Sequence, residues 1–433
     1  MGSVKHRILA TAVAPPPWGD RPAEWRVLLR TVEQRTKDAL GAVDAPGELL
    51  LPDNLLVSRE FLEAFLAIAG TRPGERVLVA VLGPGVTARR YAGRSVLAPG
   101  PDGSLPLPLL LVPEGVSVDV PDEAALLTLA ADAEPVVVDP DEETKEIPVS
   151  RAYADPGKTT LTIGGTRRYA AHLTHRSHLI NANHDVLAGE FIAAARGSKP
   201  WLALRYLWSV LRGLLPWSPR VVLSKVGRGC KIHPTAIVEA CRLGDNVEIG
   251  AYSVVRACVF GEGAVVEEFA HVTLCIAEEG VRIGAHVKQF ASVMMERSHS
   301  TQELMQGSVL GRDAVTTQIS WFTDVSFDRN IRVEAPRESG LRFLDSGSRF
   351  LGCDVGHDTI VGFWVATAPG RYLPSHCTIV AETPAVMKRI HPDVDPLDAG
   401  GATLTVRDGV LVPLKPGSAP RPPPDAPDSP EDP

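Results

Sequence analysis

The sequence predicts an α/β domain followed by a parallel β-solenoid. Two observations lead to this fold class. Helix-like and strand-like segments alternate before about residue 190, as in α/β layers, and a repeat of aliphatic residues begins at residue 226. The length of 433 residues supports more than one domain, because a single hydrophobic core rarely organises a chain of that size.

The first predicted domain spans residues 1–195. Its helix-like stretches are EWRVLLRTVEQRTKDAL and SREFLEAFLAIA, and its strand-like stretches are VLVAVLG and LLLVP. Turns that contain Pro and Gly separate these stretches. The alternation predicts helices packed on a sheet.

The second predicted domain spans residues 226–395 and is defined by its repeat. A residue that is usually aliphatic opens each six-residue unit, and equivalent units return every 17 residues. Three columns show this step: Val226, Leu243 and Phe260; Ile232, Ile249, Val266 and Ile283; and Val238, Val255 and Val272. The spacing predicts short strands and tight turns wound into a triangular coil, with aliphatic side chains inside and small residues at the corners.

A polar segment interrupts the repeat within residues 289–308, and we expect it to loop out of the solenoid. The repeat resumes at Val355, Val361, Thr367, Leu373 and Ile379. Loops of this kind help to wall active sites between neighbouring subunits of solenoid enzymes. The interruption is therefore where we look first for chemistry.

Two further segments differ in composition from the predicted domains. Residues 196–231 contain eight Lys or Arg, three Trp and no Asp or Glu. Residues 196–225 are interpreted as a basic, Trp-rich helical linker packed between the domains, with peripheral contact to anionic lipid or a nucleotide-facing patch as alternatives. The C-terminal extension, 396–433, is Pro-rich and acidic from about residue 414, which predicts disorder there.

The overall composition narrows the class of protein. The formal net charge is -8, which argues against nucleic acid as the main partner. The N-terminus lacks the apolar run of a secretory leader, and no apolar stretch is long enough to span a membrane. We therefore expect a cytoplasmic protein. The six cysteines form no C-x-x-C pair and are interpreted as small buried hydrophobic residues.

Four segments resemble a known family. They are RPAEWRVLLRTVEQR, LLLPDNLLVSREFLEAF, HLINANHDVLAGEF and LDSGSRFLGCDVGHDTIVG. Together with the six-residue units, they are similar to the bifunctional N-acetylglucosamine-1-phosphate uridyltransferases and glucosamine-1-phosphate acetyltransferases. The resemblance implies an α/β nucleotidyltransferase domain, a left-handed β-helix acyltransferase domain and a homotrimer.

The N-terminal half departs from this family at its phosphate-binding turn. A nucleotidyltransferase holds nucleotide phosphates with the backbone N–H groups of a Gly-rich turn. ILATAVAPPPWGDRP stands in that place, and its prolines remove N–H donors. We therefore interpret the domain as a degenerate nucleotidyltransferase. Asp53 is the candidate ligand for Mg²⁺ if a nucleotide is bound.

The resemblance also implies site residues in the solenoid. His299 lies near the position of the catalytic general base. Gln302 falls where the family has Tyr, Asp324 where it has an oxyanion-stabilising Asn, and Arg329 or Asn330 where it has Lys. An Asp at the Asn position would repel a developing oxyanion, so the acceptor or the acyl group is expected to differ from the family's.

Two further arginines, Arg342 and Arg349, could bind a phosphate or carboxylate, or make salt bridges between subunits. The leading functional hypothesis is an acyltransferase. It would use acetyl-CoA or another acyl-CoA as co-substrate and acylate an amine on a sugar phosphate or a related small molecule. The alternatives are a non-catalytic scaffold or regulatory protein, and a sugar-1-phosphate nucleotidyltransferase.

Overall fold

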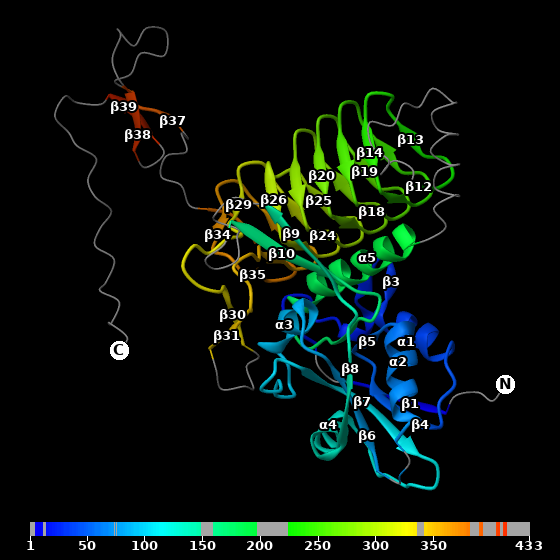
Figure 1. Ribbon diagram of the computed structural model, residues 1–433. Coiled ribbons are helices and arrows are strands. Elements are labelled where there is room, and N and C mark those ends of the chain that lie inside the picture. Colours follow the sequence, from blue (N-terminus) through cyan, green and yellow to red (C-terminus); the bar gives the residue numbers. More distant parts are fainter. Residues whose placement is uncertain are drawn as a thin grey trace. The chain divides into compact units, whose positions relative to one another are not determined.

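A computed structural model of the chain shows an α/β domain followed by a parallel β-solenoid, as the sequence predicts (Figure 1). It describes residues 5–11, 14–72, 74, 76–148, 159–196, 224–335, 342–381, 389–392, 404–407 and 410–413. The chain divides into two compact units, Met1–Ile379 and Val380–Pro433. The first unit contains the first predicted domain and the second predicted domain up to Ile379.

The α/β domain is built on a mixed five-stranded sheet with the strand order β1-β4-β7-β6-β8. Strands β1 and β4 are parallel, as are β6 and β8, whereas β7 runs antiparallel to both of its neighbours. The strands are β1 (His6–Leu9), β4 (Gly47–Pro52), β6 (Leu78–Leu82), β7 (Leu105–Pro113) and β8 (Glu134–Val138). The helices are α1 (Val32–Leu40), α2 (Arg59–Ala69), α3 (Val86–Ala92), α4 (Glu123–Asp132) and α5 (His178–Arg196).

Both faces of this sheet are buried. Leu49 and Leu51 of β4 belong to the larger apolar cluster, whereas Leu50 between them belongs to a smaller cluster with Leu126 of α4. Successive side chains of a strand point to opposite faces, so a run of three leucines serves two cores. This is the physical basis of the run of three leucines in β4.

One predicted helix is shorter than its sequence pattern. The helix-like segment 24–40 becomes helical only at Val32. A short 3-10 turn, η1 (Pro22–Glu24), and a hairpin of β2 (Arg26–Val27) and β3 (Arg30–Thr31) come before it. Leu28 and Leu29 turn this hairpin with φ of 45° and 68°. Thr31 then caps α1 in a capping box with Gln34.

Smaller strands complete the domain. β5 (Leu55–Val57) pairs with β11 (Ala170–His172), and β9 (Glu143–Pro148) pairs with β10 (Thr160–Gly165). Both pairs are antiparallel. The first pair brings the segment before α5 against the segment that follows β4.

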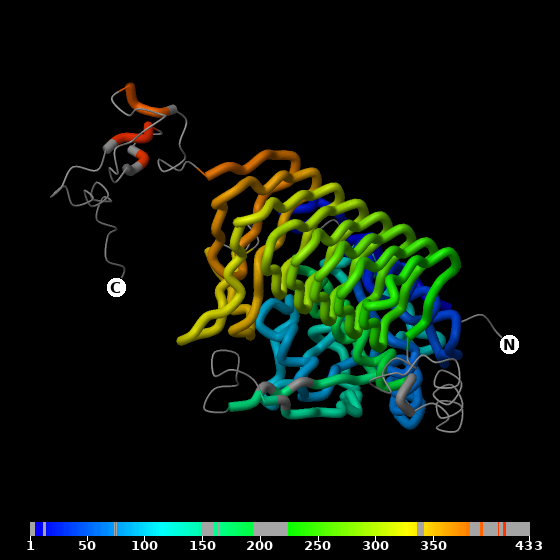
Figure 2. The backbone as a smooth tube through the Cα atoms, turned by 90° about the horizontal axis from the view of Figure 1, so that it is seen from above, coloured from blue at the N-terminus to red at the C-terminus, as the bar shows by residue number. Residues whose placement is uncertain are grey.

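The solenoid is a stack of coils with up to three strands in each coil, and most strands pair in parallel with their counterparts in the neighbouring coils (Figure 2). We name its sheets the first, second and third faces, in chain order.

The first face is β12 (Lys225–Val226), β15 (Arg242–Leu243), β18 (Val259–Phe260), β21 (Ile276–Ala277), β24 (Val293–Met294), β27 (Val309–Leu310), β32 (Asp354–Val355) and β35 (Tyr372–Leu373). The second face is β13 (Lys231–Ile232), β16 (Glu248–Ile249), β19 (Val265–Val266), β22 (Arg282–Ile283), β25 (His299–Ser300), β28 (Val315–Thr316), β33 (Ile360–Val361) and β36 (Thr378–Ile379). The third face is β14 (Ile237–Glu239), β17 (Val254–Arg256), β20 (His271–Thr273), β23 (Lys288–Phe290) and β26 (Leu304–Gln306), continued by the pair β29 (Trp321–Phe322) and β34 (Ala366–Thr367).

The predicted loop at 289–308 is wrong. Residues of this segment form β24, β25 and β26, which pair in register with their neighbours. The coil is one residue shorter here, because Lys288 pairs with Leu304, 16 positions on, whereas Arg282 pairs with His299, 17 positions on. Small polar side chains such as Ser300, which is fully buried, fit the interior where the sequence pattern suggested an excursion.

The true excursion comes later, at residues 323–353, between β29 of the third face and β32 of the first face. It contains an antiparallel hairpin of β30 (Arg332–Glu334) and β31 (Phe343–Asp345). After it the repeat resumes where the sequence predicts, because Val355, Val361, Thr367, Leu373 and Ile379 all lie in solenoid strands.

Among the residues that the structure describes, the last solenoid strand ends at Ile379, before the predicted boundary at 395. In the second unit, β37 (Arg389–Ile390), β39 (Val410–Pro413) and β38 (Leu404–Arg407) form a small sheet. Most of the predicted linker at 196–225 and the tail from 414 lie outside the described residues. Among the helices that the structure describes, none is long and apolar enough to cross a membrane.

Candidate functional site

The first face of the solenoid packs against the α/β domain. The outward side chains of its middle strands, Val259, Ile276, Val293 and Val309, are buried in the same apolar cluster as the leucines of β4. This contact joins the two domains of the first unit through a shared core. The polar groups around that core are the first candidate site.

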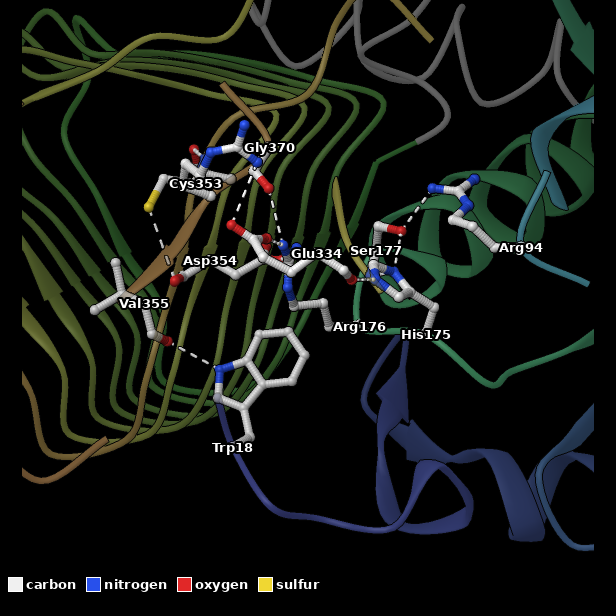
Figure 3. Close-up of polar contacts among 12 residues, drawn as sticks. Trp18, Arg94, His175, Arg176, Ser177, Glu334, Cys353, Asp354, Val355 and Gly370 are labelled. Carbon is white, nitrogen blue, oxygen red and sulfur yellow. Dashed lines mark hydrogen bonds and ion pairs between the residues drawn. The ribbon is translucent and has the colours of Figure 1, made fainter. Parts of the chain in front are cut away.

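Arg176, just before α5, is the centre of a buried polar network (Figure 3). Its Nη1 donates to Asp354 Oδ2 at 2.8 Å, and its Nη2 donates to Gly370 O at 2.8 Å and to Glu334 Oε2 at 2.5 Å. All three acceptors belong to the solenoid or its hairpin. Burial raises the pKa of Asp354 to about 6, although Arg176 opposes this rise.

A serine beside Arg176 extends the network into the α/β domain (Figure 3). Ser177 Oγ lies 2.7 Å from His175 Nδ1 and accepts a hydrogen bond from Arg94 Nη1 at 2.6 Å. The other ring nitrogen of His175 lies 3.1 Å from Glu334 O. Burial and the neighbouring arginines lower the pKa of His175 to about 3, so the ring is neutral.

The proline-rich loop after β1 is also bound to the solenoid. Trp18 Nε1 donates to Val355 O at 2.9 Å, as Figure 3 shows, and Ser375 Oγ donates to Pro17 O at 2.6 Å. This loop stands where the resemblance places the phosphate-binding turn. Its hydrogen bonds therefore link the domains.

Asp20, in the same loop, makes the charged part of that contact. It accepts two hydrogen bonds from Arg312, at 2.7 and 2.8 Å, and lies 3.0 Å from His357 Nε2. Burial alone would raise the pKa of Asp20, but the hydrogen bonds from His357 and Arg312 outweigh it and lower the pKa to about 2.

Three glutamates meet beside this contact. Oxygens of Glu278, Glu279 and Glu296 all lie within 4.8 Å of one another, and Arg26 of β2 forms ion pairs with Glu279 and Glu296. Glu278 accepts one hydrogen bond, from the backbone N–H of Glu296 at 3.2 Å. Burial raises the pKa of Glu278 to about 8, with Arg26 opposing and the two other glutamates adding to the rise.

Asp53, the predicted magnesium ligand, lies just after β4 and is buried. Its Oδ1 accepts hydrogen bonds from the backbone N–H and the hydroxyl of Thr11, at 3.1 and 2.8 Å. Its Oδ2 lies 3.5 Å from Arg21 Nη1. The carboxylate therefore closes the loop after β1 and faces an arginine.

His299, the predicted general base, begins β25 and lies on the outer side of the second face. Its Nε2 is buried without a hydrogen-bond partner among the described residues, whereas its Nδ1 is not fully buried. Burial lowers the pKa of His299, nearby Arg282 lowers it further, and Glu267 partly opposes them. The ring is therefore neutral near pH 7 and can accept a proton at Nδ1.

Gln302 and Asp324, the two predicted neighbours of His299, lie elsewhere. Gln302 is fully buried within the solenoid, where its Nε2 donates to Leu304 O at 2.8 Å. Asp324 lies at the start of the 323–353 excursion. Its Oδ2 is buried without a partner among the described residues, and burial raises the pKa of its carboxyl.

The predicted anion-binding residues gather on the hairpin. Arg329 and Asn330 line an open hollow of about 460 Å³, and the rest of its wall is Arg332, Phe343, Leu344 and Asp345. Asn330 Nδ2 donates to Asp345 Oδ2 at 3.2 Å. The guanidinium groups of Arg329 and Arg332 have no hydrogen-bond or ion-pair partner among the described residues.

The two other predicted arginines differ from each other. Arg342 lies over the ring of Phe343, 5.2 Å from its centroid, next to the hollow. Arg349 donates to the backbone carbonyl oxygens of Ser326 and Phe327, so it supports the excursion from within.

Within one chain, His299 and the hollow lie on opposite sides of the solenoid. The hairpin leaves the corner between the third and first faces, and the second face lies opposite that corner. No hydrogen bond or ion pair among the described residues joins His299 to the hairpin. The structure therefore brings Arg329 and Asn330 together with each other but not with His299.

The interdomain residues were not found by sequence reasoning. Arg176 and Asp354 are 178 positions apart, and Asp20 and Arg312 are 292 positions apart. The only sequence signal near Arg176 is the dense polar run THRSH within an otherwise apolar segment. Buried charges require partners, but a sequence does not say which partners the fold supplies.

Comparisons with known proteins identify no family for this chain. No protein-family model matches it, and no curated protein matches it. Among solved structures, a match is found with a Bacillus cereus protein described as a candidate acetyltransferase, at 13% sequence identity and a TM-score of 0.16. The match covers 34% of this chain and 78% of that chain.

Proposed function

We propose that the protein is an acyltransferase that moves an acyl group from a coenzyme A thioester to an amine on an anionic small molecule. The observation that carries this proposal is His299. It presents a half-buried, neutral imidazole on the outer side of the second face, and of its two nitrogens only Nε2 is fully buried. A base of this kind is what amine acylation requires near neutral pH.

In the proposed reaction, His299 Nδ1 removes a proton from the ammonium group of the acceptor. The free amine attacks the thioester carbonyl, the C–S bond breaks, and an amide forms. The coenzyme A thiolate leaves and takes up the second proton that the nitrogen loses on becoming an amide, and the imidazolium returns its proton to solvent, so the products are the amide, the free thiol and one proton. Transfer of the proton away from the amine is the step that the imidazole accelerates.

The hollow on the hairpin supports an anionic acceptor. The guanidinium groups of Arg329 and Arg332 line it without carboxylate partners among the described residues, so they are available to a phosphate. Asp345 also lines it, but one of its carboxylate oxygens accepts from Asn330 and the other from the backbone N–H of Gly347. A sugar phosphate is the acceptor class we propose.

A complete site would combine two copies of the chain, because His299 and the hollow lie on opposite sides of one solenoid. The homotrimer that the resemblance implies would place the second face of one copy near the hairpin of another. The oligomeric state is part of the proposal.

The test is thiol release from acetyl-CoA and octanoyl-CoA in the presence of amino-sugar phosphates. We expect His299→Ala to lower kcat by about 10²–10⁴, the usual scale for loss of a general base. His233→Ala is the matched control, because His233 is an exposed histidine of an early coil, and this variant should retain full activity. Equal activities for wild type and His299→Ala would refute the assignment.

A mixing experiment tests the shared site. His299→Ala and the double variant Arg329→Ala/Arg332→Ala should each have strongly reduced activity. Co-expressed in one cell, they should recover a measurable fraction of wild-type activity, since mixed assemblies contain some intact sites. No recovery from a purified mixed assembly would contradict a site that combines two copies.

A second candidate function is a non-catalytic scaffold. The observation that favours it is the loop of Trp18 and Asp20, which lies where the family binds nucleotide phosphates and is instead bonded to the solenoid. A scaffold would release no thiol from any acyl-CoA and would be indifferent to His299→Ala.

A further inference from the structure

An apolar strip lies beside His299 on the outer surface of the last coils. His299 pairs with Val315 of the next coil, and Val315 pairs with Ile360 of the coil after that. All three occupy the outward position of their strands. We use the name apolar strip for five residues: Val315, Ile319, Ile360, Phe363 and Trp364.

Most of the strip is exposed. Ile360, Phe363 and Trp364 keep 45%, 55% and 54% of their surface accessible. In the strand column before His299, Lys231 forms an ion pair with Glu248 at 2.6 Å and Arg282 forms one with Glu267 at 3.3 Å, with Val265 between them. The column therefore changes from mostly charged before His299 to apolar after it.

Two residues of the strip occupy strained backbone positions. Ile319 has a φ of 64° and Trp364 a φ of 66°, and the N–H of Trp364 donates to Ile319 O at 3.1 Å. A bulky side chain in the left-handed region costs about 1–2 kcal/mol, and a β-branched one is an outlier there. Other corners of the solenoid also hold non-glycine residues in this region, such as Phe269 with a φ of 60°. The exposure of Ile319 and Trp364, and not their backbone conformation, therefore marks the strip as a candidate contact surface.

We propose that the apolar strip holds the hydrocarbon chain of the acyl donor, so that the donor class is a medium-chain acyl thioester rather than acetyl-CoA. This inference rests on the proposed acyl transfer at His299. Adjacent strands lie about 4.8 Å apart, so the column from His299 to Ile360 spans about 10 Å. An extended chain whose carbonyl lies at His299 would pass over Val315 and reach Ile360, whereas an acetyl group would touch none of the strip beyond Val315.

The experiment compares acetyl-, butyryl-, hexanoyl- and octanoyl-CoA in thiol-release assays. As long as each added methylene of the acyl chain lies on the strip, kcat/KM should rise by up to about fourfold per methylene. This is the usual gain for a buried CH₂ group. Ile360→Thr keeps a β-branched strand residue and should lower kcat/KM for octanoyl-CoA at least threefold, with the acetyl-CoA value unchanged.

The chain offers a matched control. Val265 lies two coils before His299 in the same outward column, as Ile360 lies two coils after it. Val265→Thr should leave the whole chain-length profile unchanged. Equal effects of the two substitutions would overturn the proposal.

The outcomes separate this inference from the function on which it rests. If turnover is equally fast with acetyl- and octanoyl-CoA, the strip does not hold the acyl chain, but acyl transfer remains the function. If no thioester is turned over, the proposed function is wrong. Equilibrium binding then tests whether the strip holds an acyl chain. Octanoyl-CoA must bind more tightly than acetyl-CoA and must lose that advantage in Ile360→Thr. A change of oligomeric state in Ile360→Thr, without a change in chain-length preference, would show that another copy covers the strip and would overturn the proposal.

Discussion

At Arg176, one buried guanidinium serves two carboxylates and a backbone carbonyl of the solenoid. Removing one member of a buried ion pair leaves the other charge without compensation. We expect Arg176→Met to lower the free energy of unfolding by about 3–5 kcal/mol. Urea denaturation followed by fluorescence measures it.

Arg371 provides the control for this prediction. It also contacts Glu334, at 3.3 Å, but a third of its side chain is exposed. Arg371→Met should therefore cost less than about 1 kcal/mol. Similar losses for the two variants would mean that burial of Arg176 adds nothing to its ion pairs.

The buried carboxyl of Glu278 should make the stability of the protein depend on pH. Its pKa is raised from 4.5 to about 8 in the folded protein, chiefly by burial, so the folded state holds this proton more tightly than the unfolded state. Its contribution to stability is complete below about pH 4.5 and is lost as the pH rises through 8. We expect the free energy of unfolding of Glu278→Gln to rise relative to that of wild type across this interval, by on the order of 2 kcal/mol.

Thermal unfolding between pH 5 and 9 measures this difference, with Glu262→Gln as the control, because Glu262 is an exposed glutamate of an earlier corner. The groups that face Glu278 are Glu279, Glu296, Arg26 and Arg312. A wild-type profile parallel to that of Glu278→Gln would refute the assignment.

At the scale of the element, the solenoid depends on close contact between corners of successive coils. A Cβ added to Gly356 would overlap backbone atoms of Pro374 and Ser375, which cannot move without displacing the next coil. We expect Gly356→Ala to destabilise the protein by about 2–3 kcal/mol. Gly284 is the control, because its added Cβ would come no closer than 3.2 Å to Thr301 Cγ2 and 3.3 Å to Ser300 O, whereas the one at Gly356 would lie 2.4 Å from Ser375 N. Gly284→Ala should stay within about 0.5 kcal/mol of wild type in urea denaturation.

The solenoid also shows why a short coil is hard to recognise in sequence. Ser300 and Thr316 take the inward positions that Ile283 and Val361 take in other coils. With one residue fewer in the turn and polar side chains inside, the aliphatic period disappears from the sequence although the coil continues. Strand pairing with the coils before and after maintains the structure where local pattern is weak.

At the scale of the whole molecule, the shared core predicts that the solenoid is not independent. Residues 224–379 alone would expose Val259, Ile276, Val293 and Val309, which the α/β domain covers. We expect this fragment to aggregate or to bind a hydrophobic dye strongly. Replacing all four residues by Thr should restore a soluble fragment, as judged by size-exclusion chromatography. A well-behaved fragment without these replacements would contradict the prediction.

The sequence by itself determined the architecture. The 17-residue step placed the strands of every coil before the short one, and the same pattern located the resumption at Val355. Alternation of helix-like and strand-like segments was enough for the α/β domain, although the hairpin before Val32 was missed. These features depend on local periodicity. The period recurs along each strand or helix, so it is visible in the sequence itself.

Only the tertiary structure decided which polar residues meet. It placed Asp20 against Arg312, Arg176 against Asp354, and Gln302 inside the solenoid, away from His299. It also brought Arg329 and Asn330 to a common hollow on a hairpin that the sequence did not locate. Such contacts join residues far apart in the chain, and their partners depend on how faces and corners pack. No local pattern carries that information, because a charged residue can lie in solvent, in an ion pair or in a binding site.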